Sequence, residues 1–354
     1  MVINKLIAPI CESDITKHWI HDEKIYVSIV CITFNQESYI SDAIESFLAQ
    51  VFTHRFEIVI HDDCSTDKTS EILNAYKERY PNIIRLVLQN QNQFSKGHKI
   101  LPLAAKYAIG EYLAICEGDD FWIDRNKLQL QFDLIMESPN TDICFTSAYM
   151  LHEIGRFNHY ASYSSIARTF TLSEVVRGGG MFMPTGSIML NRNVFNRLPY
   201  WFNHVPVGDL FLQIIASING GASYLPNVTT VYRLNSVGSW SSSQAKKLRS
   251  LSIKEEYATL NKYLTYMELL SDYGIEDKDI SFQKAVILSN SAKKLLSSNV
   301  VDVKASDLKN EINQIIVQSW KCFPCVNRVQ FLMYHFRISH TFLRFLFRVW
   351  SLKI

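Results

Sequence analysis

Short apolar runs alternate with segments of helical periodicity from residue 25 to about residue 140. Four runs rich in β-branched and aromatic residues predict buried strands over residues 27–32, 56–60, 83–88 and 112–116. Apolar residues that recur every three or four positions predict helices over residues 38–50, 66–80, 101–109 and 124–137. This alternation favours an α/β fold, with a mostly parallel central sheet flanked by helices.

The second half of the chain has a different pattern. After Ile143 the alternation loosens, leaving a strand-like run over 187–190 and a helical run over 210–217. From about residue 245 the chain becomes Lys-rich and helical in pattern. We therefore expect an N-terminal extension (1–24), an α/β domain (25–244) and a C-terminal helical extension (245–354).

The last stretch of the chain predicts a basic amphipathic helix. Residues 319–354 contain no acid, and Arg337, Arg344 and Arg348 lie with Thr341 and Ser351 on one polar stripe. Such a helix suits an anionic membrane surface, which would make the protein a peripheral membrane protein. The alternative is a packing helix that completes a core or the interface of a homo-oligomer.

Composition narrows the class of protein. The chain has 354 residues, of which 47% are hydrophobic, and a net charge of +2, which argues against nucleic-acid binding across the whole molecule. Its seven scattered cysteines are typical of reduced thiols in the cytoplasm. Cys322 and Cys325 form a lone C-x-x-C, which is weak evidence for a zinc or redox site. Residues 1–10 make a poor signal peptide, and the uncharged run 210–232 is interrupted by glycine, asparagine and proline, so no membrane span is expected.

An acidic cluster, Glu117-Gly118-Asp119-Asp120, directly follows the predicted strand at 112–116. These carboxylates would repel one another unless a positive charge lay among them. Divalent cations bind such oxygens, and nucleotide phosphates complete the coordination shell. The alternative is a solvated acidic turn that caps the next helix.

Polar residues also follow the other three predicted strands. Thr33 and Asn35 end the first strand, Asp62 and Asp63 end the second, and the loop that contains Lys96 follows the third. Ligands of open α/β sheets bind at the carboxyl ends of strands, so these residues predict a nucleotide-binding crevice. For the second cluster, the alternative is a simple helix cap.

Four sequence blocks now carry a family resemblance: VSIVCITFN (27–35), FEIVIHDDCSTDKT (56–69), GEYLAICEGDDFW (110–122) and GDL (208–210). From residue 27 to about 240 the chain resembles family 2 glycosyltransferases of the GT-A fold, inverting enzymes of bacterial surface-polysaccharide assembly. The resemblance implies a nucleotide-diphosphate-sugar donor, expected to be a UDP-sugar. The expected acceptor is a hydroxyl of a glycan or of a polyprenyl-diphosphate-linked sugar.

The resemblance also implies roles for individual residues. Thr33, Asn35 and Asp63 would contact the nucleoside. The D-x-D element of the family falls on residues 117–119, so that Asp119 would face the ribose and diphosphate. Asp119 or Asp120 would hold Mn²⁺ or Mg²⁺, while the Glu in the first position leaves open whether Glu117 touches the metal.

Two further residues have expected roles near the reacting groups. Asp209 matches the catalytic base of the family, which would accept the proton of the acceptor hydroxyl. The alternative is that Asp209 caps the helix that follows. Arg233 is a cationic candidate for phosphate, and the alternative is a salt bridge at the sheet edge.

Two other functions compete with this hypothesis. A sugar nucleotidyltransferase would carry a Gly-rich basic loop after its first strand, which residues 33–37 do not form. A non-catalytic scaffold, binding partners or membrane through its C-terminal helices, would be expected to lose acids that this chain retains. The absent Q-x-x-R-W motif of processive synthases favours the addition of one sugar per visit.

Overall fold

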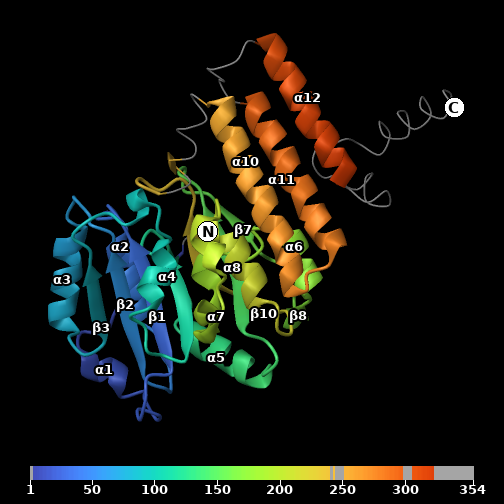
Figure 1. Ribbon diagram of the computed structural model, residues 1–354. Helices are drawn as coiled ribbons and strands as arrows, with labels where there is room; N and C mark the ends of the chain where they lie inside the picture. The colour runs from blue at the N-terminus through green and yellow to red at the C-terminus, as the bar shows by residue number, and fades with distance from the viewer. Residues whose placement is uncertain (1–2, 240–241, 244–250, 298–304, 323–354) are drawn as a thin grey trace. The chain divides into compact units, whose positions relative to one another are not determined.

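The computed structural model describes residues 3–239, 242–243, 251–297 and 305–322 (Figure 1). The chain divides into two compact units, Met1–Ala245 and Lys246–Ile354. The expected basic helix over 337–351 and Cys325 lie outside the described residues.

The first four strands of the first unit are parallel neighbours in the order β3-β2-β1-β4 (Figure 1). They are β1 (Val27–Thr33), β2 (Phe56–Asp62), β3 (Ile84–Leu88) and β4 (Tyr112–Glu117). The connecting segments contain α2 (Ile40–Leu48), α3 (Thr69–Arg79) and α4 (Ile100–Ala105). Because the chain builds outward from β1 to β3 and then returns to the other side of β1, the strand order reverses between β1 and β4. Ligands of α/β sheets bind at such a switch point.

Beyond β4 the sheet becomes mixed, continuing in the order β9-β6-β10-β5. β10 (Ala222–Arg233) runs parallel to β6 (Ile143–Leu151), whereas β9 (Met189–Asn191) is antiparallel to β4 and β6. The smaller strands are β5 (Phe121–Trp122), β7 (Phe157–Tyr160) and β8 (Arg168–Phe170). The helical segments here are α5 (Lys127–Glu137), α6 (Leu172–Gly178), η2 (Thr185–Ser187), α7 (Asn193–Asn196), η3 (Tyr200–His204) and α8 (Gly208–Ala216). The predicted α/β fold is thus confirmed, with its parallel pairings concentrated in the first four strands.

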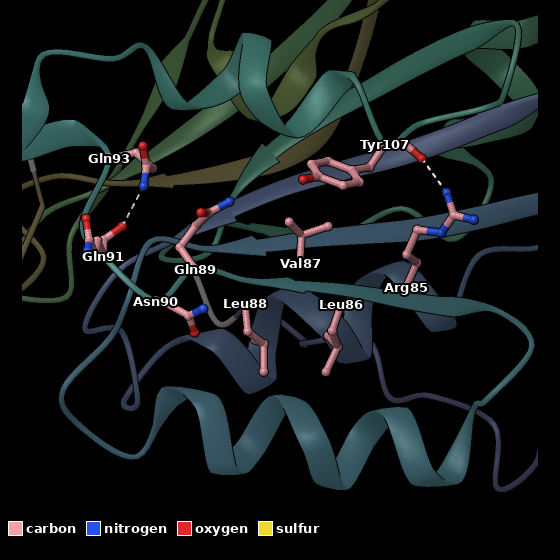
Figure 2. A pocket seen from close by; sticks show the side chains of 9 residues that line it. All are labelled: Arg85, Leu86, Val87, Leu88, Gln89, Asn90, Gln91, Gln93 and Tyr107. Atoms are coloured by element: carbon pink, nitrogen blue, oxygen red, sulfur yellow. Dashed lines mark hydrogen bonds between the residues drawn. The ribbon is translucent and has the colours of Figure 1, made fainter.

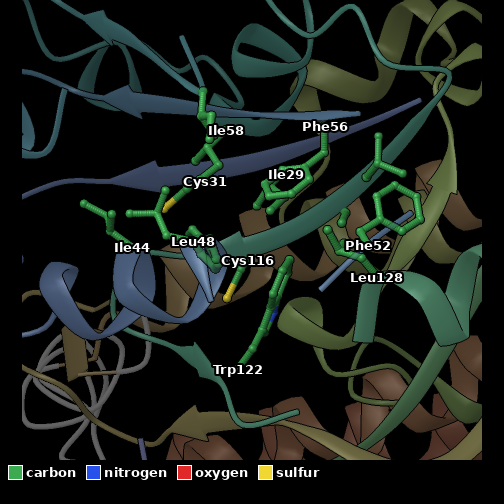
Figure 3. Packing of buried hydrophobic residues seen from close by; sticks show 14 of the residues in the cluster. Ile29, Cys31, Ile44, Leu48, Phe52, Phe56, Ile58, Cys116, Trp122 and Leu128 are labelled. Atoms are coloured by element: carbon green, nitrogen blue, oxygen red, sulfur yellow. The ribbon is translucent and has the colours of Figure 1, made fainter. Parts of the chain in front are cut away.

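The core of this unit lies between the sheet and its helices, and Figure 3 shows part of it around Cys116 and Trp122. Trp122 packs edge-on against Phe47, with ring centroids 4.7 Å apart, and donates its indole N–H to the Gly186 carbonyl at 2.8 Å. The ammonium of the buried Lys127 lies 4.3 Å from the Trp122 ring centre. Burial lowers the pKa of Lys127 to about 8. These contacts anchor the chain immediately after the acidic cluster.

The N-terminal segment packs onto the same core. Its short helix α1 (Glu12–Thr16) buries Ile15, and Trp19 lies edge-on against Phe56 with ring centroids 5.7 Å apart. The N–H groups of the next two residues, Ile20 and His21, both donate to the Thr53 carbonyl. Residues that precede β1 are therefore part of the first unit.

The second unit contains the helices α10 (Ile253–Glu268), η4 (Leu269–Tyr273), α11 (Asp277–Ser297) and α12 (Ala305–Cys322). Its own apolar core includes Leu260, Leu288 and Ile315. The expected C-terminal helices are thereby confirmed. Within the described parts of the chain, no helix is long and apolar enough to cross a membrane.

Candidate active site

The acidic cluster begins at the last residue of β4 and turns sharply against the end of β1. The N–H of Gly118 donates to the Ile32 carbonyl at 2.9 Å, which holds the turn beside β1. A Cβ atom at Gly118 would lie 2.5 Å from Oε1 of Gln36 and 2.9 Å from Cβ of Thr33. Only a glycine allows this close approach. The lack of a side chain at Gly118 therefore lets the turn hold Glu117 and Asp119 beside the end of β1.

Both aspartates of the cluster are held by residues at the end of β10. The hydroxyl of Ser236 donates to Oδ2 of Asp119, and the Arg233 N–H donates to Oδ1 of Asp120 at 2.8 Å. The Arg233 guanidinium also donates to the backbone carbonyl of Asp119. Oδ2 of Asp120 is buried and has no hydrogen-bond partner among the described residues.

Asp209 joins this cluster from a distant part of the sequence. It lies in the first turn of α8, and its charge is among those that raise the pKa of Glu117, after burial and the charge of Asp119. Burial also raises the pKa of Asp120, and the charge of Asp119 raises it further. Burial raises the pKa of Asp209 itself, and the nearby Lys99 ammonium opposes that rise. The result is a concentration of negative charge in a poorly solvated place.

The chemistry of this cluster fits a divalent cation. A cation would neutralise the crowded carboxylates, and it would give a partner to Oδ2 of Asp120, a buried oxygen that has none in the described part of the chain. Among the residues that the structure describes, no three His, Cys, Asp or Glu side chains already converge as a ligand set. Mg²⁺ is commonly bound through one or two carboxylates plus substrate phosphates, so a cation that arrives with a diphosphate suits this site.

The expected nucleoside-binding residues lie together at the ends of β1 and β2. Hydrogen bonds also link the loops that follow these two strands. Thr33 donates its hydroxyl to Gln36 at 2.8 Å. Asn35 has a left-handed backbone (φ 52°), and its side-chain oxygen accepts the Thr66 N–H at 2.7 Å. This geometry connects the two strand ends, which lie next to each other in the sheet.

The two acids at the end of β2 have distinct local contacts. Asp62 accepts the N–H of Ser65 at 3.2 Å and the hydroxyl of Ser70 at 3.0 Å, which closes a local turn after β2, while the N-cap position of α3 is Lys68. Asp63 accepts the backbone N–H groups of Gln93 at 2.7 Å and Phe94 at 3.0 Å. Asp63 therefore also orders the loop that follows β3.

Lys96 hydrogen-bonds within the loop that follows β3. It is exposed on η1 (Phe94–Lys96), and its ammonium donates to the side chain of Gln91. Gln91 lines an open, polar hollow of about 560 Å³ beside the edge strand β3 (Figure 2). Lys99, three residues later, instead donates to the Pro206 carbonyl at 3.3 Å and lies near Asp209. Its place in the loop after β3 was the only sequence signal for this contact.

Arg233 is buried in contact with the acidic cluster. Its guanidinium pairs with Asp42 of α2 and lies 4.4 Å from the ring centre of Phe121 and 5.2 Å from that of Tyr39. The structure thus shows the salt bridge, and a phosphate contact stays a prediction. Asp42 has no motif around it, and its only sequence signal is a charge beside the apolar face of a helix.

Comparisons with known proteins agree with this geometry. Residues 28–198 match the family model described as Glycosyl transferase family 2. An uncharacterised protein of Mycobacterium tuberculosis is 34% identical over 217 residues, which cover 61% of each chain. The UDP-Glc:alpha-D-GlcNAc-diphosphoundecaprenol beta-1,3-glucosyltransferase WfgD of Escherichia coli is 29% identical over 225 residues, covering 63% of this chain and 82% of WfgD.

Residues 1–349 of TarS from S. aureus, solved in complex with UDP-GlcNAc, align with a TM-score of 0.51 at 17% identity, covering 84% of this chain and 73% of that one. At that identity the likeness concerns the fold alone. The α/β unit therefore has the GT-A fold, and residues 28–198 within it match glycosyl transferase family 2. The chain spans 61% of the length of the mycobacterial relative.

Proposed function

We propose that this protein transfers a sugar, with inversion, from a UDP-sugar to a hydroxyl of a glycan or of a polyprenyl-diphosphate-linked acceptor. The observation that carries the proposal is the closeness of Asp209 to Glu117, the first carboxylate of residues 117–120, at the switch point of the sheet. The match of residues 28–198 to the family 2 model supports the sugar-transfer chemistry. The name of WfgD supports the UDP-linked donor and the lipid-diphosphate acceptor.

Asp209 would act as the general base. It would accept the proton of the acceptor hydroxyl while that oxygen forms a bond to the anomeric carbon. The bond from this carbon to the donor diphosphate breaks on the opposite side, which inverts the configuration. Burial strengthens Asp209 as a base by raising its pKa, and Lys99 limits the rise so that the carboxylate remains available.

Asp119, with Asp120 beside it, would hold Mn²⁺ or Mg²⁺. Asp119 is the more open of the two, at 7% against 1% exposure, and is better placed to share a cation with a diphosphate. When bound, the cation would stabilise the charge of the departing diphosphate. Thr33, Asn35, Asp62 and Asp63 would bind the nucleoside.

Lys96 and Arg233 are the proposed cationic contacts of the donor. Both now have partners within the chain, so either would have to exchange a protein acceptor for a phosphate oxygen. For the exposed Lys96 this exchange is easy, because a solvated ion pair or hydrogen bond contributes little.

A thermal-shift screen of UDP-, GDP-, dTDP- and CMP-sugars, with and without Mn²⁺, tests the donor and the metal together. We expect UDP-sugars to raise the melting temperature, and Mn²⁺ to enlarge that shift. The absence of a response to every nucleotide would overturn the proposal and favour a non-catalytic scaffold. Pyrophosphate release from UTP and a sugar 1-phosphate would instead indicate a sugar nucleotidyltransferase.

We further propose that the reaction takes place in the cytoplasm, at the inner face of the cytoplasmic membrane. The arginines of residues 337–351 and the lipid-linked acceptor support this location. A homo-oligomer assembled through the C-terminal helices is the alternative use of this region.

A further inference from the structure

An ion-pair cluster from three distant segments lies against the acidic loop. The carboxylate oxygen Oδ2 of Asp42 lies 2.7 Å from the ammonium of Lys5 and also accepts the guanidinium of Arg233. Lys5 comes from the N-terminal segment, Asp42 from α2 and Arg233 from β10. The side chain of Arg233 is only 10% exposed, so its charge depends on these protein partners.

Arg233 has two kinds of acceptor within its surroundings. One is Asp42, with which its guanidinium pairs. The other is the acidic loop, where Nη1 donates to the Asp119 carbonyl and the backbone N–H donates to the Asp120 carboxylate. Its charge also lowers the pKa of both aspartates against the rise caused by burial. A buried guanidinium that lost Asp42 would be drawn to the carboxylates of Asp119 and Asp120, on which its charge already acts.

Hydrogen bonds hold the N-terminal segment in place, so that Lys5 lies at this cluster. The N–H of Ala8 donates to Glu45 at 2.5 Å, and Glu45 lies on the same helix as Asp42. The Pro9 carbonyl accepts the hydroxyl of Tyr80, which is buried. Lys5 itself is 55% exposed, so we expect it to orient Asp42 and to contribute little energy of its own.

We propose that Asp42, oriented by Lys5, is a positioning residue that keeps the Arg233 guanidinium off the carboxylates of Asp119 and Asp120. The guanidinium then does not compete with a divalent cation for those carboxylates. The inference rests on the proposed function, because it needs this cation to bind at the acidic loop. It gives the N-terminal segment a role in donor binding.

Direct Mn²⁺ binding to the full chain in the presence of UDP, followed by the EPR signal of free Mn²⁺, tests the inference without an activity assay. We expect Asp42→Asn to weaken Mn²⁺ binding by about 10-fold, since the freed guanidinium competes with the cation for the same oxygens. Asp42→Glu should restore most of the affinity. Lys5→Met should weaken binding by about 2-fold.

The matched controls are Asp14→Asn and Lys17→Met, which break an exposed ion pair (3.1 Å) of the same N-terminal segment. Both should bind Mn²⁺ as the wild-type chain does. Circular dichroism should show that every variant is folded. Wild-type affinity in Asp42→Asn would overturn the inference and leave the proposed function intact, whereas a wild-type chain that binds UDP but no Mn²⁺ would overturn the metal site and the inference together.

Discussion

Asp209, in the first turn of α8, lies close enough to Glu117, the last residue of β4, for its charge to raise the pKa of that glutamate. Like charges in a poorly solvated place destabilise each other, so the fold maintains this pair at a cost. Such arrangements concentrate at functional sites. The relationship brings a proposed base and a proposed cation-binding loop to one place.

The first prediction concerns the base. Asp209→Asn should lower kcat by about 10²- to 10⁴-fold, because the amide cannot accept the proton of the acceptor hydroxyl. The dissociation constant of UDP, measured by calorimetry, should change little, since Asp209 is not expected to touch the nucleotide. Full activity in this variant would show that Asp209 is only an acidic residue of the first turn of α8 and not the base.

The second prediction concerns pH. A base must be deprotonated, so activity is present above the pKa of Asp209 and is lost as the pH falls through it. Since burial raises this pKa above the ordinary 3.8, the acid limb of the kcat profile should lie above that value. Lys99→Met removes the cation that opposes the rise, so the limb should move to still higher pH. A variant of the exposed Lys106, Lys106→Met, should leave the limb in place, and an unmoved limb in Lys99→Met would contradict the coupling.

The third prediction concerns the turn at Gly118. A methyl group there would meet Gln36 and Thr33 at 2.5–2.9 Å, so Gly118→Ala should lower the free energy of unfolding by about 1–3 kcal/mol. It should also weaken UDP binding, since Thr33 and Asp119 would be displaced together. Gly180→Ala is the control, because its added carbon would lie no closer than 3.4 Å to a neighbouring side chain. Chemical denaturation of both variants measures the difference, and equal stability would show that the turn has room for a side chain.

The fourth prediction concerns the C-terminal stretch. Deleting residues 323–354 leaves α12, which ends at Cys322, and removes a segment with five basic residues and no acid. We expect the truncated chain to lose sedimentation with vesicles that contain anionic lipid, and the full chain to lose it at high salt. Unchanged sedimentation would reject membrane contact by this segment, and a change in mass by light scattering would favour an oligomer interface.

Much of the first half of the fold could be predicted because its signals are local. Each of the four parallel strands is an apolar run of the right length, and the structure extends β1, β2 and β4 by only one or two residues. β10 was missed, since its twelve residues include Pro226 and Asn227 and its pairing with β6 shifts register there. The helix expected at 101–109 is the shorter α4, which ends at Ala105.

By itself, the sequence determined that polar and acidic residues follow four buried strands, because hydrophobic periodicity and strand polarity are properties of neighbouring residues. Only the tertiary structure decided which charges meet. It paired Arg233 with Asp42, placed Lys99 rather than Lys96 near Asp209, and brought Asp209 to Glu117. Such contacts depend on strand register and on the closure of long loops, and no local pattern of residues encodes either.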